Sequence, residues 1–538
     1  MTQRRTLHPG RILLAAAATL FAGACATIPT HPERDRIAPA QPATPPPKTA
    51  SAPEEGATAT AAGPLTLDLP DAILLALENN RGLAIQRLEP QIRRTTEETA
   101  RAAFDPTLAA SFARERSRDD RRAAAGQRPH TDAWTAAAGA SQFLPTGTTL
   151  EASLQASKTI QDATATATDN SSSAAGLTIT QALLRGFGAT VNLATLRQAR
   201  LDTLSSQYEL RGYAETLVAD VEKTYWDLIL ARSQAGIVSR SLTLAEKQLA
   251  EIRERIQVGK LAPTEQAAAE AELALRHEEL IDAESTAAKL HVRLLRLLSP
   301  ATTAGATSFD RVLTLTATPE LPNRQLEPAE THVRRALDHR ADLNQARLQL
   351  QRNELELVQT RNGLLPKLDL FISLGQSGYA DSFAGAWRDN DGDDYALTAG
   401  LKLEFPPANR EARARHTRAT LTQAQAREAL ANQAQLAEED VRSAWLEIQR
   451  TRAQVAATAA TQRLQQEKSR VESERFRVGK TTSLQLAQTQ RDALASELAA
   501  TRAVAASLNA WVDLYKAEGI LLEMRGIAAP ATEPIPAP

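Results

Sequence analysis

Two long stretches without proline constrain the fold of this chain most. Residues 191–258 and 411–478 are equally long and contain no proline, and the second stretch also has no glycine. A continuous helix of that length spans roughly 100 Å, at about 1.5 Å of rise per residue. A compact globular core does not need so long a helix. We therefore predict two very long helices in a protein that crosses a wide space.

The two stretches are copies of one repeat. Both end in a similar phrase, Glu254–Lys260 in the first and Glu474–Lys480 in the second, and the same offset aligns the residues before these phrases. Further upstream, Ala76 and Leu77 match Ala336 and Leu337 at a larger offset. The chain is therefore an internal duplication. The difference between the two offsets places an additional segment in the first copy, between its front helix and its long helix.

The segments between the front and long helices have the alternation that is typical of β-strands. Apolar and β-branched residues alternate with polar ones in five runs, at 133–143, 148–158, 177–180, 368–374 and 395–405. Several runs approach the ~9–11 residues that a membrane strand needs. Strands cross a bilayer only in a closed barrel, and a few per chain close one only in a symmetric oligomer. The additional segment of the first copy forms either a longer outer loop or a hairpin.

Residues 1–24 have the pattern of a signal peptide. Arg4, Arg5 and Arg11 precede an apolar run at 12–21, which is shorter than the ~20 residues of a spanning helix. Small residues follow, up to Cys25. This arrangement resembles a bacterial lipoprotein signal, and the resemblance implies that Cys25 is lipidated. An ordinary signal peptide, cut just before Cys25, is the alternative.

The remaining boundaries follow from composition. Residues 25–63 are rich in Pro, Ala and Thr and bury too little apolar surface to fold, so we expect a lipidated N-terminus and a disordered linker. The same holds for a disordered tail at 525–538. Between them we place a first repeat at 64–298, a connector at 299–327 and a second repeat at 328–524. Residues 71–101 should be mainly helical, with a kink or division at Pro90.

Composition excludes several classes of function. The chain has 62 Lys and Arg against 64 Asp and Glu, a net charge of -2, so its charge gives no basis for binding nucleic acid. The single cysteine excludes an internal disulfide and a multi-thiolate metal site. We identify no phosphate-binding loop, metal cluster or nucleophile–base pair. We therefore expect no enzyme, no cofactor and no metal.

Several phrases in these repeats resemble the TolC-like outer membrane efflux protein family. They are the strand-to-helix phrases Gln181–Gly188 and Phe405–Arg413 and the two Val-Gly turns that end the long helices. With the lipoprotein signal, the chain resembles an outer membrane factor lipoprotein of that family. The resemblance covers about residues 65–524. Each phrase is weak alone, but their order and duplication are specific.

The resemblance implies an α+β membrane protein that is a homotrimer in the outer membrane. Four strands per subunit would form a transmembrane β-barrel of 12 strands, and the long helices a periplasmic coiled-coil barrel. Its expected partners are a periplasmic adaptor protein, an inner-membrane pump and outer-membrane lipid. The implied function is a passive duct of a tripartite efflux system. A conduit for type I protein secretion and a lipid-anchored periplasmic coiled-coil scaffold are the alternatives.

The resemblance also suggests where this chain works. It assigns contact with the adaptor to the two helix turns, formed by Val258, Gly259, Lys260, Leu261, Val478, Gly479, Lys480 and Thr481. Family members narrow the tunnel with aspartates just beyond the second turn, and the matching residues here are Gln485 and Gln488. Glu265 occupies the corresponding place in the first repeat. A glutamine ring hydrogen-bonds but does not attract cations, so we predict a constriction with little sensitivity to cations, where Glu265 is the one candidate charge.

Overall fold

The computed structural model describes residues 65–118, 130–162, 168–299, 309, 311–322, 324–390 and 395–536. The signal peptide, Cys25 and the linker up to residue 63 lie outside the described residues. The described residues form two compact units. Among the described residues, the strand unit contains those of 96–199 and 353–422, and the helical unit contains those of 65–95, 200–352 and 423–536.

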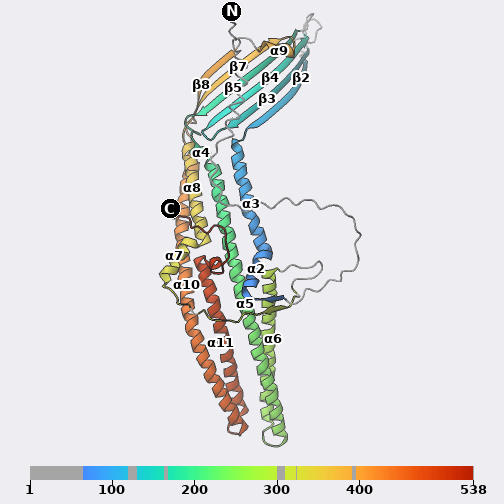
Figure 1. The fold of residues 1–538 in the computed structure, drawn as a ribbon, viewed down its shortest axis with the longest axis vertical. Coiled ribbons are helices and arrows are strands. Elements are labelled where there is room, and N and C mark those ends of the chain that lie inside the picture. Colours follow the sequence, from blue (N-terminus) through green and yellow to red (C-terminus); the bar gives the residue numbers. More distant parts are fainter. Residues whose placement is uncertain are drawn as a thin grey trace, which may run out of the picture. The chain divides into compact units, whose positions relative to one another are not determined.

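The two long helices are confirmed. Helix α5 runs over Ala194–Gln257 and α10 over Arg410–Arg477, and the short α4 (Ala189–Asn192) precedes α5. Each long helix is followed by a returning helix, α6 (Thr264–Leu298) after α5 and α11 (Ser483–Glu518) after α10. In the helical unit these make two hairpins (Figure 1).

Both front helices divide into a short and a longer piece. The first gives α2 (Leu69–Asn79) and α3 (Arg81–Arg101), and the second gives α7 (Ala329–His339) and α8 (Ala341–Gly363).

Pro90 was expected to kink or divide the front helix. It does not divide it, because the break lies at Asn80. The backbone of Asn80 leaves the helical region with a ψ of 120°, and its side-chain oxygen accepts a hydrogen bond from the Leu83 N–H at 3.1 Å. Its side-chain nitrogen donates to the Leu297 carbonyl at 2.9 Å. Asn80 thus caps α3 and ties it to α6, whereas α3 continues through Pro90, which removes one backbone donor.

The helical unit is built on a core where α5 meets the end of α6. Tyr225 of α5 is fully buried, and its hydroxyl donates to the Leu67 carbonyl at 3.0 Å. Leu67 ends β1 (Leu65–Leu67), which pairs in parallel with β6 (Leu313–Leu315). Leu294 and Leu298 of α6 complete this core with the short α12 (Leu521–Met524).

The C-terminal segment is bound to the helical unit and is not the loose tail that composition suggested. Arg211 donates to the Ala531 carbonyl at 3.1 Å, and Arg347 donates to the Ile535 carbonyl at 3.0 Å. Ala531 and Ile535 pack against the buried cluster of Tyr208, Ala341 and Leu348. The two hydrogen bonds join residues 320 and 188 positions apart, so an argument from local composition cannot predict them.

The strand unit holds one antiparallel sheet. A 3-10 turn, η1 (Ala102–Phe104), leads into β2 (Thr107–Arg118), followed by β3 (His130–Phe143), β4 (Thr148–Asp162) and β5 (Thr168–Ala182). The second repeat adds β7 (Lys367–Ala380), the short α9 (Phe383–Asp389) and β8 (Tyr395–Glu404). The strand order is β2-β3-β4-β5-β7-β8.

The expectation of four strands per chain is wrong for the described residues, which contribute six to this sheet (Figure 1). The additional segment of the first repeat forms a strand pair, which was one of the two alternatives. All five strand runs lie within strands of this sheet, the last reaching one residue past its end. Strand β2 was missed because its sequence alternates poorly, with alanines at 109, 110 and 113.

Candidate functional site: the two-faced sheet and the helix tips

One face of the sheet is apolar along its whole width. Side chains alternate between the faces of a strand, and directly paired residues share a face, so the registers define each face. A single row across the sheet is Leu108, Ala140, Ala152, Leu177, Leu374 and Leu397. Neighbouring rows on this apolar face add Phe112, Ala138, Leu154, Ile179, Ile372 and Leu401.

The opposite face is polar. It carries Thr, Ser, Gln and charged side chains between small residues, such as Glu151, Ser153 and Gln155 on β4. Hydroxyl pairs link neighbouring strands across it. They join Thr107 to Ser141 at 2.7 Å, Ser157 to Ser172 at 2.6 Å and Thr178 to Ser373 at 3.0 Å. A sheet with one apolar and one polar face, repeated over six strands, has the pattern of strands that separate lipid from water.

Charged and aromatic side chains bound the apolar face toward one end of β2 and β3. The Arg114 guanidinium lies 4.5 Å from the centre of the Trp134 ring and donates to Asp132 at 3.0 and 2.6 Å. Phe112 meets Trp134 edge to face at 6.4 Å. An apolar band that ends in aromatic and charged residues is what a bilayer boundary favours.

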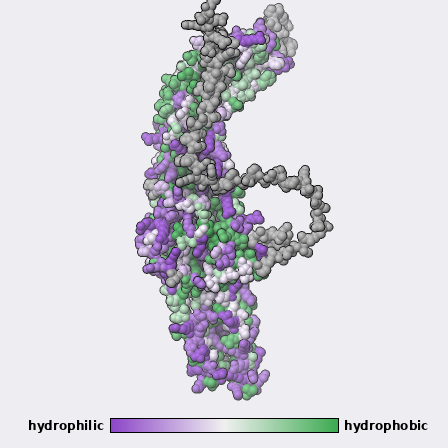
Figure 2. All heavy atoms as spheres, viewed as in Figure 1, coloured by the Kyte–Doolittle hydropathy of each residue, from purple (hydrophilic) through white to green (hydrophobic). Residues whose placement is uncertain are grey.

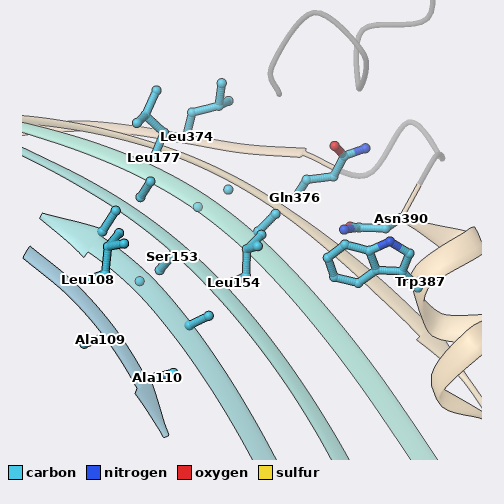
Figure 3. A pocket seen from close by; sticks show the side chains of 17 residues that line it. Leu108, Ala109, Ala110, Ser153, Leu154, Leu177, Leu374, Gln376, Trp387 and Asn390 are labelled. Carbon is cyan, nitrogen blue, oxygen red and sulfur yellow. The ribbon is translucent and has the colours of Figure 1, made fainter. Parts of the chain in front are cut away.

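Helix α9 lies against the apolar face. The Ser173 hydroxyl donates to the Ala386 carbonyl at 2.7 Å, and an added Cβ on Gly378 would lie 2.2 Å from that same oxygen. Glycine at 378 is therefore required for the helix to approach the strand. The Trp387 ring turns toward Leu154 over a hollow of about 580 Å³ lined by the strands (Figure 3).

The two helix turns, which we call the tips, have the same backbone geometry. Gly259 and Gly479 have φ values of 72° and 73°, in the left-handed region that favours glycine. The N–H of Lys260 donates to the Arg255 carbonyl, and that of Lys480 to the Arg475 carbonyl, each at 2.8 Å. This 6→1 bond satisfies carbonyls at the helix end. The duplicated sequence therefore produces a duplicated turn.

The tips are exposed at their ends, and the helices that lead to them pack together through buried side chains. Val258 and Val478 are each 61% exposed, and the surface around them is mostly hydrophilic (Figure 2). Ile252, Phe476 and Leu486 form a small apolar cluster that joins the two hairpins. This cluster packs the two hairpins against each other beneath the tips.

Ionic contacts reinforce the tips on the first hairpin. Arg253 of α5 pairs with Glu270 of α6 at 2.7 Å, and Gln266 donates to the same carboxylate at 2.9 Å. These hydrogen bonds hold the pKa of Glu270 below its ordinary value.

The three predicted constriction residues lie near the tips, Glu265 on α6 and Gln485 and Gln488 on α11. Glu265 is half-buried at the start of α6, and its carboxylate accepts a hydrogen bond from the Ser483 hydroxyl of α11. Gln485 and Gln488 are exposed on the first turns of α11.

The start of α11 had a usable signal in the sequence. Thr482 caps the helix by accepting from the Gln485 N–H at 3.3 Å. A Thr followed three residues later by a Gln is the pattern of a capping box. The contact between Glu265 and Ser483 had no such signal, because it joins two hairpins.

Two kinds of feature are missing from the described residues. Among them no helix is both long and apolar enough to cross a membrane. Within the same part of the chain, no three His, Cys, Asp or Glu side chains gather in a way that could hold a metal ion.

Comparison with known proteins agrees on one fold. Residues 332–519 match the family model described as outer membrane efflux protein. No curated protein matches the sequence. The structure is similar to the CmeC outer membrane channel of Campylobacter jejuni, with a TM-score of 0.64 and 16% identity over 84% of this chain and 86% of that chain.

Two further channels show the same similarity. The open state of the MtrE outer membrane channel of Neisseria gonorrhoeae gives a TM-score of 0.62 at 18% identity, over 84% of this chain and 89% of that one. The outer membrane protein VceC from Vibrio cholerae gives 0.62 at 14% identity, over 84% and 96%. At these identities the similarity establishes the fold.

Proposed function

We propose that this chain, in which residues 332–519 match the outer membrane efflux protein family, is the outer-membrane duct of a tripartite efflux system. In this proposal three copies surround one channel. The sheets lie in the outer membrane and the long helices extend into the periplasm. The duct is passive and has no chemistry of its own. An adaptor protein connects it to an inner-membrane pump, which supplies the energy.

The observation that carries the proposal is the two-faced sheet. An apolar face that continues over all six strands stabilises a sheet in lipid, and a polar face opposite it suits a water-filled lumen. A periplasmic scaffold that never enters the membrane has no use for an apolar face of this width. Such a face would be a site of aggregation in water.

We assign adaptor docking to the two tips. Val258 and Val478 are apolar and exposed, and each stands next to a glycine turn and a lysine. The apolar cluster beneath them fixes the two turns relative to each other. A docking surface of this kind offers a partner the same pattern twice, once in each repeat.

Oligomeric state and conductance test the proposal directly. We expect the detergent-purified protein to have the mass of a trimer and to give stable channels in a planar lipid bilayer. Changing Gln485 and Gln488 to Ala should raise the open conductance if these residues narrow the tunnel. A monomer or dimer that never conducts, with or without these changes, would contradict the duct and favour the scaffold.

A second experiment tests the constriction. We expect only weak block by divalent cations, because Glu265 is the single candidate carboxylate and already accepts from Ser483. Glu265→Gln should abolish that block. Glu270→Gln is the matched control, since it removes a carboxylate of the same helix that pairs with Arg253, and it should leave the block unchanged. Strong block that persists in Glu265→Gln would refute this assignment.

A further inference from the structure

The two outer strands of the sheet have free edges. Within the described residues, β2 pairs only with β3 and β8 only with β7. Residues 107–117 of β2 are all exposed, and so is every residue of β8 except the half-buried Gly400. Each edge therefore presents a row of unpaired N–H and C=O groups along its outer side.

Neither edge is interrupted by a proline or a bulge, two of the features that block strand pairing in water-soluble sheets. Strands β2 and β8 have 12 and 10 residues and contain no proline. Their registers with β3 and β7 run consecutively, without a bulge. The apolar face also reaches both edges, since Leu108 and Phe112 of β2 and Leu397 and Leu401 of β8 are exposed. Long, regular edges of this kind bind a further strand.

The strand directions indicate that the further strand at each edge comes from a second copy of this chain. All five pairings in the sheet are antiparallel, so β2 and β8 at its two ends run in opposite directions. The β8 edge of one copy is therefore antiparallel to the β2 edge of the next. The contact is head to tail, and repeating it around an axis closes a ring with no free edge.

We propose that each copy contributes all six strands to this ring, so that a trimer forms a barrel of eighteen strands, three copies of six. The inference rests on the trimeric duct of the proposed function. It departs from the twelve strands that resemblance to the family implies. Removing β3 and β4 would leave β2 leading outward and β5 returning antiparallel to it, which is the arrangement of four strands per copy that the resemblance implies.

Eighteen strands make a wider barrel than twelve. The diameter of a barrel grows roughly linearly with strand number. With strands about 4.8 Å apart and tilted by about 40°, the backbone diameter is about 36 Å for eighteen strands and about 24 Å for twelve. The backbone cylinder of the barrel is therefore about half as wide again as that of a twelve-stranded duct.

Electron cryo-microscopy of the full-length protein in lipid nanodiscs tests the strand number. We expect a threefold ring of eighteen strands in which β8 of each copy pairs with β2 of the next. A ring of twelve strands, with β3 and β4 outside it, would overturn the inference but leave the duct intact. The absence of any ring would overturn the proposed function and this inference with it.

Disulfide cross-linking of trimers in membranes gives an independent result. Ser111, Ala137, Gln155 and Ala174 form one row on the polar face across β2, β3, β4 and β5. Cysteines at Ser111 and Ala137, or at Gln155 and Ala174, should link within one chain. Cysteines at Ser111 and Ala174 should not, because they lie three strand spacings apart, about 14 Å. The reverse pattern would mean that β2 pairs directly with β5 and that the barrel has only twelve strands.

Discussion

A Leu374→Arg variant should fail to accumulate as a folded protein in the outer membrane, whereas Ser373→Arg should accumulate normally. The two residues are neighbours in the middle of β7 and lie on opposite faces of the sheet. Leu374 shares the apolar face with Leu177, and Ser373 shares the polar face with Thr178. An arginine facing lipid near the bilayer midplane costs about 2–4 kcal/mol in each copy. An arginine facing the lumen remains in water.

The comparison is made by fractionating membranes and by urea unfolding in lipid vesicles. Ser373→Arg controls for the added size and charge, and it loses only the hydrogen bond to Thr178 at 3.0 Å. Equal behaviour of the two variants would mean that the apolar face does not face lipid. Failure of Ser373→Arg alone would mean that the two faces are assigned the wrong way round.

An Arg211→Met variant should be destabilised by about 3–5 kcal/mol, because it leaves a buried carboxylate without its cation. Arg211 is 1% exposed and pairs with Glu215 at 3.1 Å and Glu523 at 2.7 Å. It also donates to the carbonyls of Gly519 and Ala531. One side chain thus ties α5 to the end of α11 and to the C-terminal segment. The midpoint of thermal or urea unfolding of the purified protein measures the loss.

The double variant Arg211→Met with Glu215→Met is the control. It removes both charges and should recover part of the lost stability, because no buried charge remains unpaired. If the double variant is as unstable as Arg211→Met, the hydrogen bonds to the two carbonyls dominate instead of the ion pair.

The same site makes stability depend on pH. Burial raises the pKa of Glu215 to about 7 from an ordinary 4.5, against the opposing effect of Arg211. Between pH 4.5 and about pH 7, Glu215 holds a proton in the folded protein that it has lost in the unfolded chain. The contribution of Glu215 to stability is therefore complete below about pH 4.5 and is lost as the pH rises toward 7. The defect of Arg211→Met should accordingly be smaller at pH 5 than at pH 8, and Glu215→Gln should flatten this dependence.

The strands of the sheet show how far alternation predicts a sheet. The runs at 133–143 and 148–158 alternate clearly, and both form strands. Strand β2 was missed because Ala109, Ala110 and Ala113 give it little contrast between its faces. Its place follows from its continuous backbone pairing with β3. Hence the predicted resemblance to the efflux proteins is confirmed, while the described residues place six strands in one sheet where the resemblance implied four.

The candidate site also has one part that the sequence predicted and one part that it did not. The two tips were predicted from repeated phrases, because a glycine with positive φ at a helix end is a local requirement. The partner of Glu265 was not predicted, since Ser483 reaches it only when the two hairpins pack through Ile252, Phe476 and Leu486.

The sequence by itself determined the long helices, their duplication and the alternating strands, because each depends on periodicity and on proline and glycine within a few turns of chain. Only the tertiary structure decided that six strands enter one sheet, that Asn80 and not Pro90 divides the front helix, and that the C-terminal segment is bound. Each of these depends on hydrogen bonds between residues far apart in the chain. Such bonds form only after the local elements have met, so local patterns do not record them.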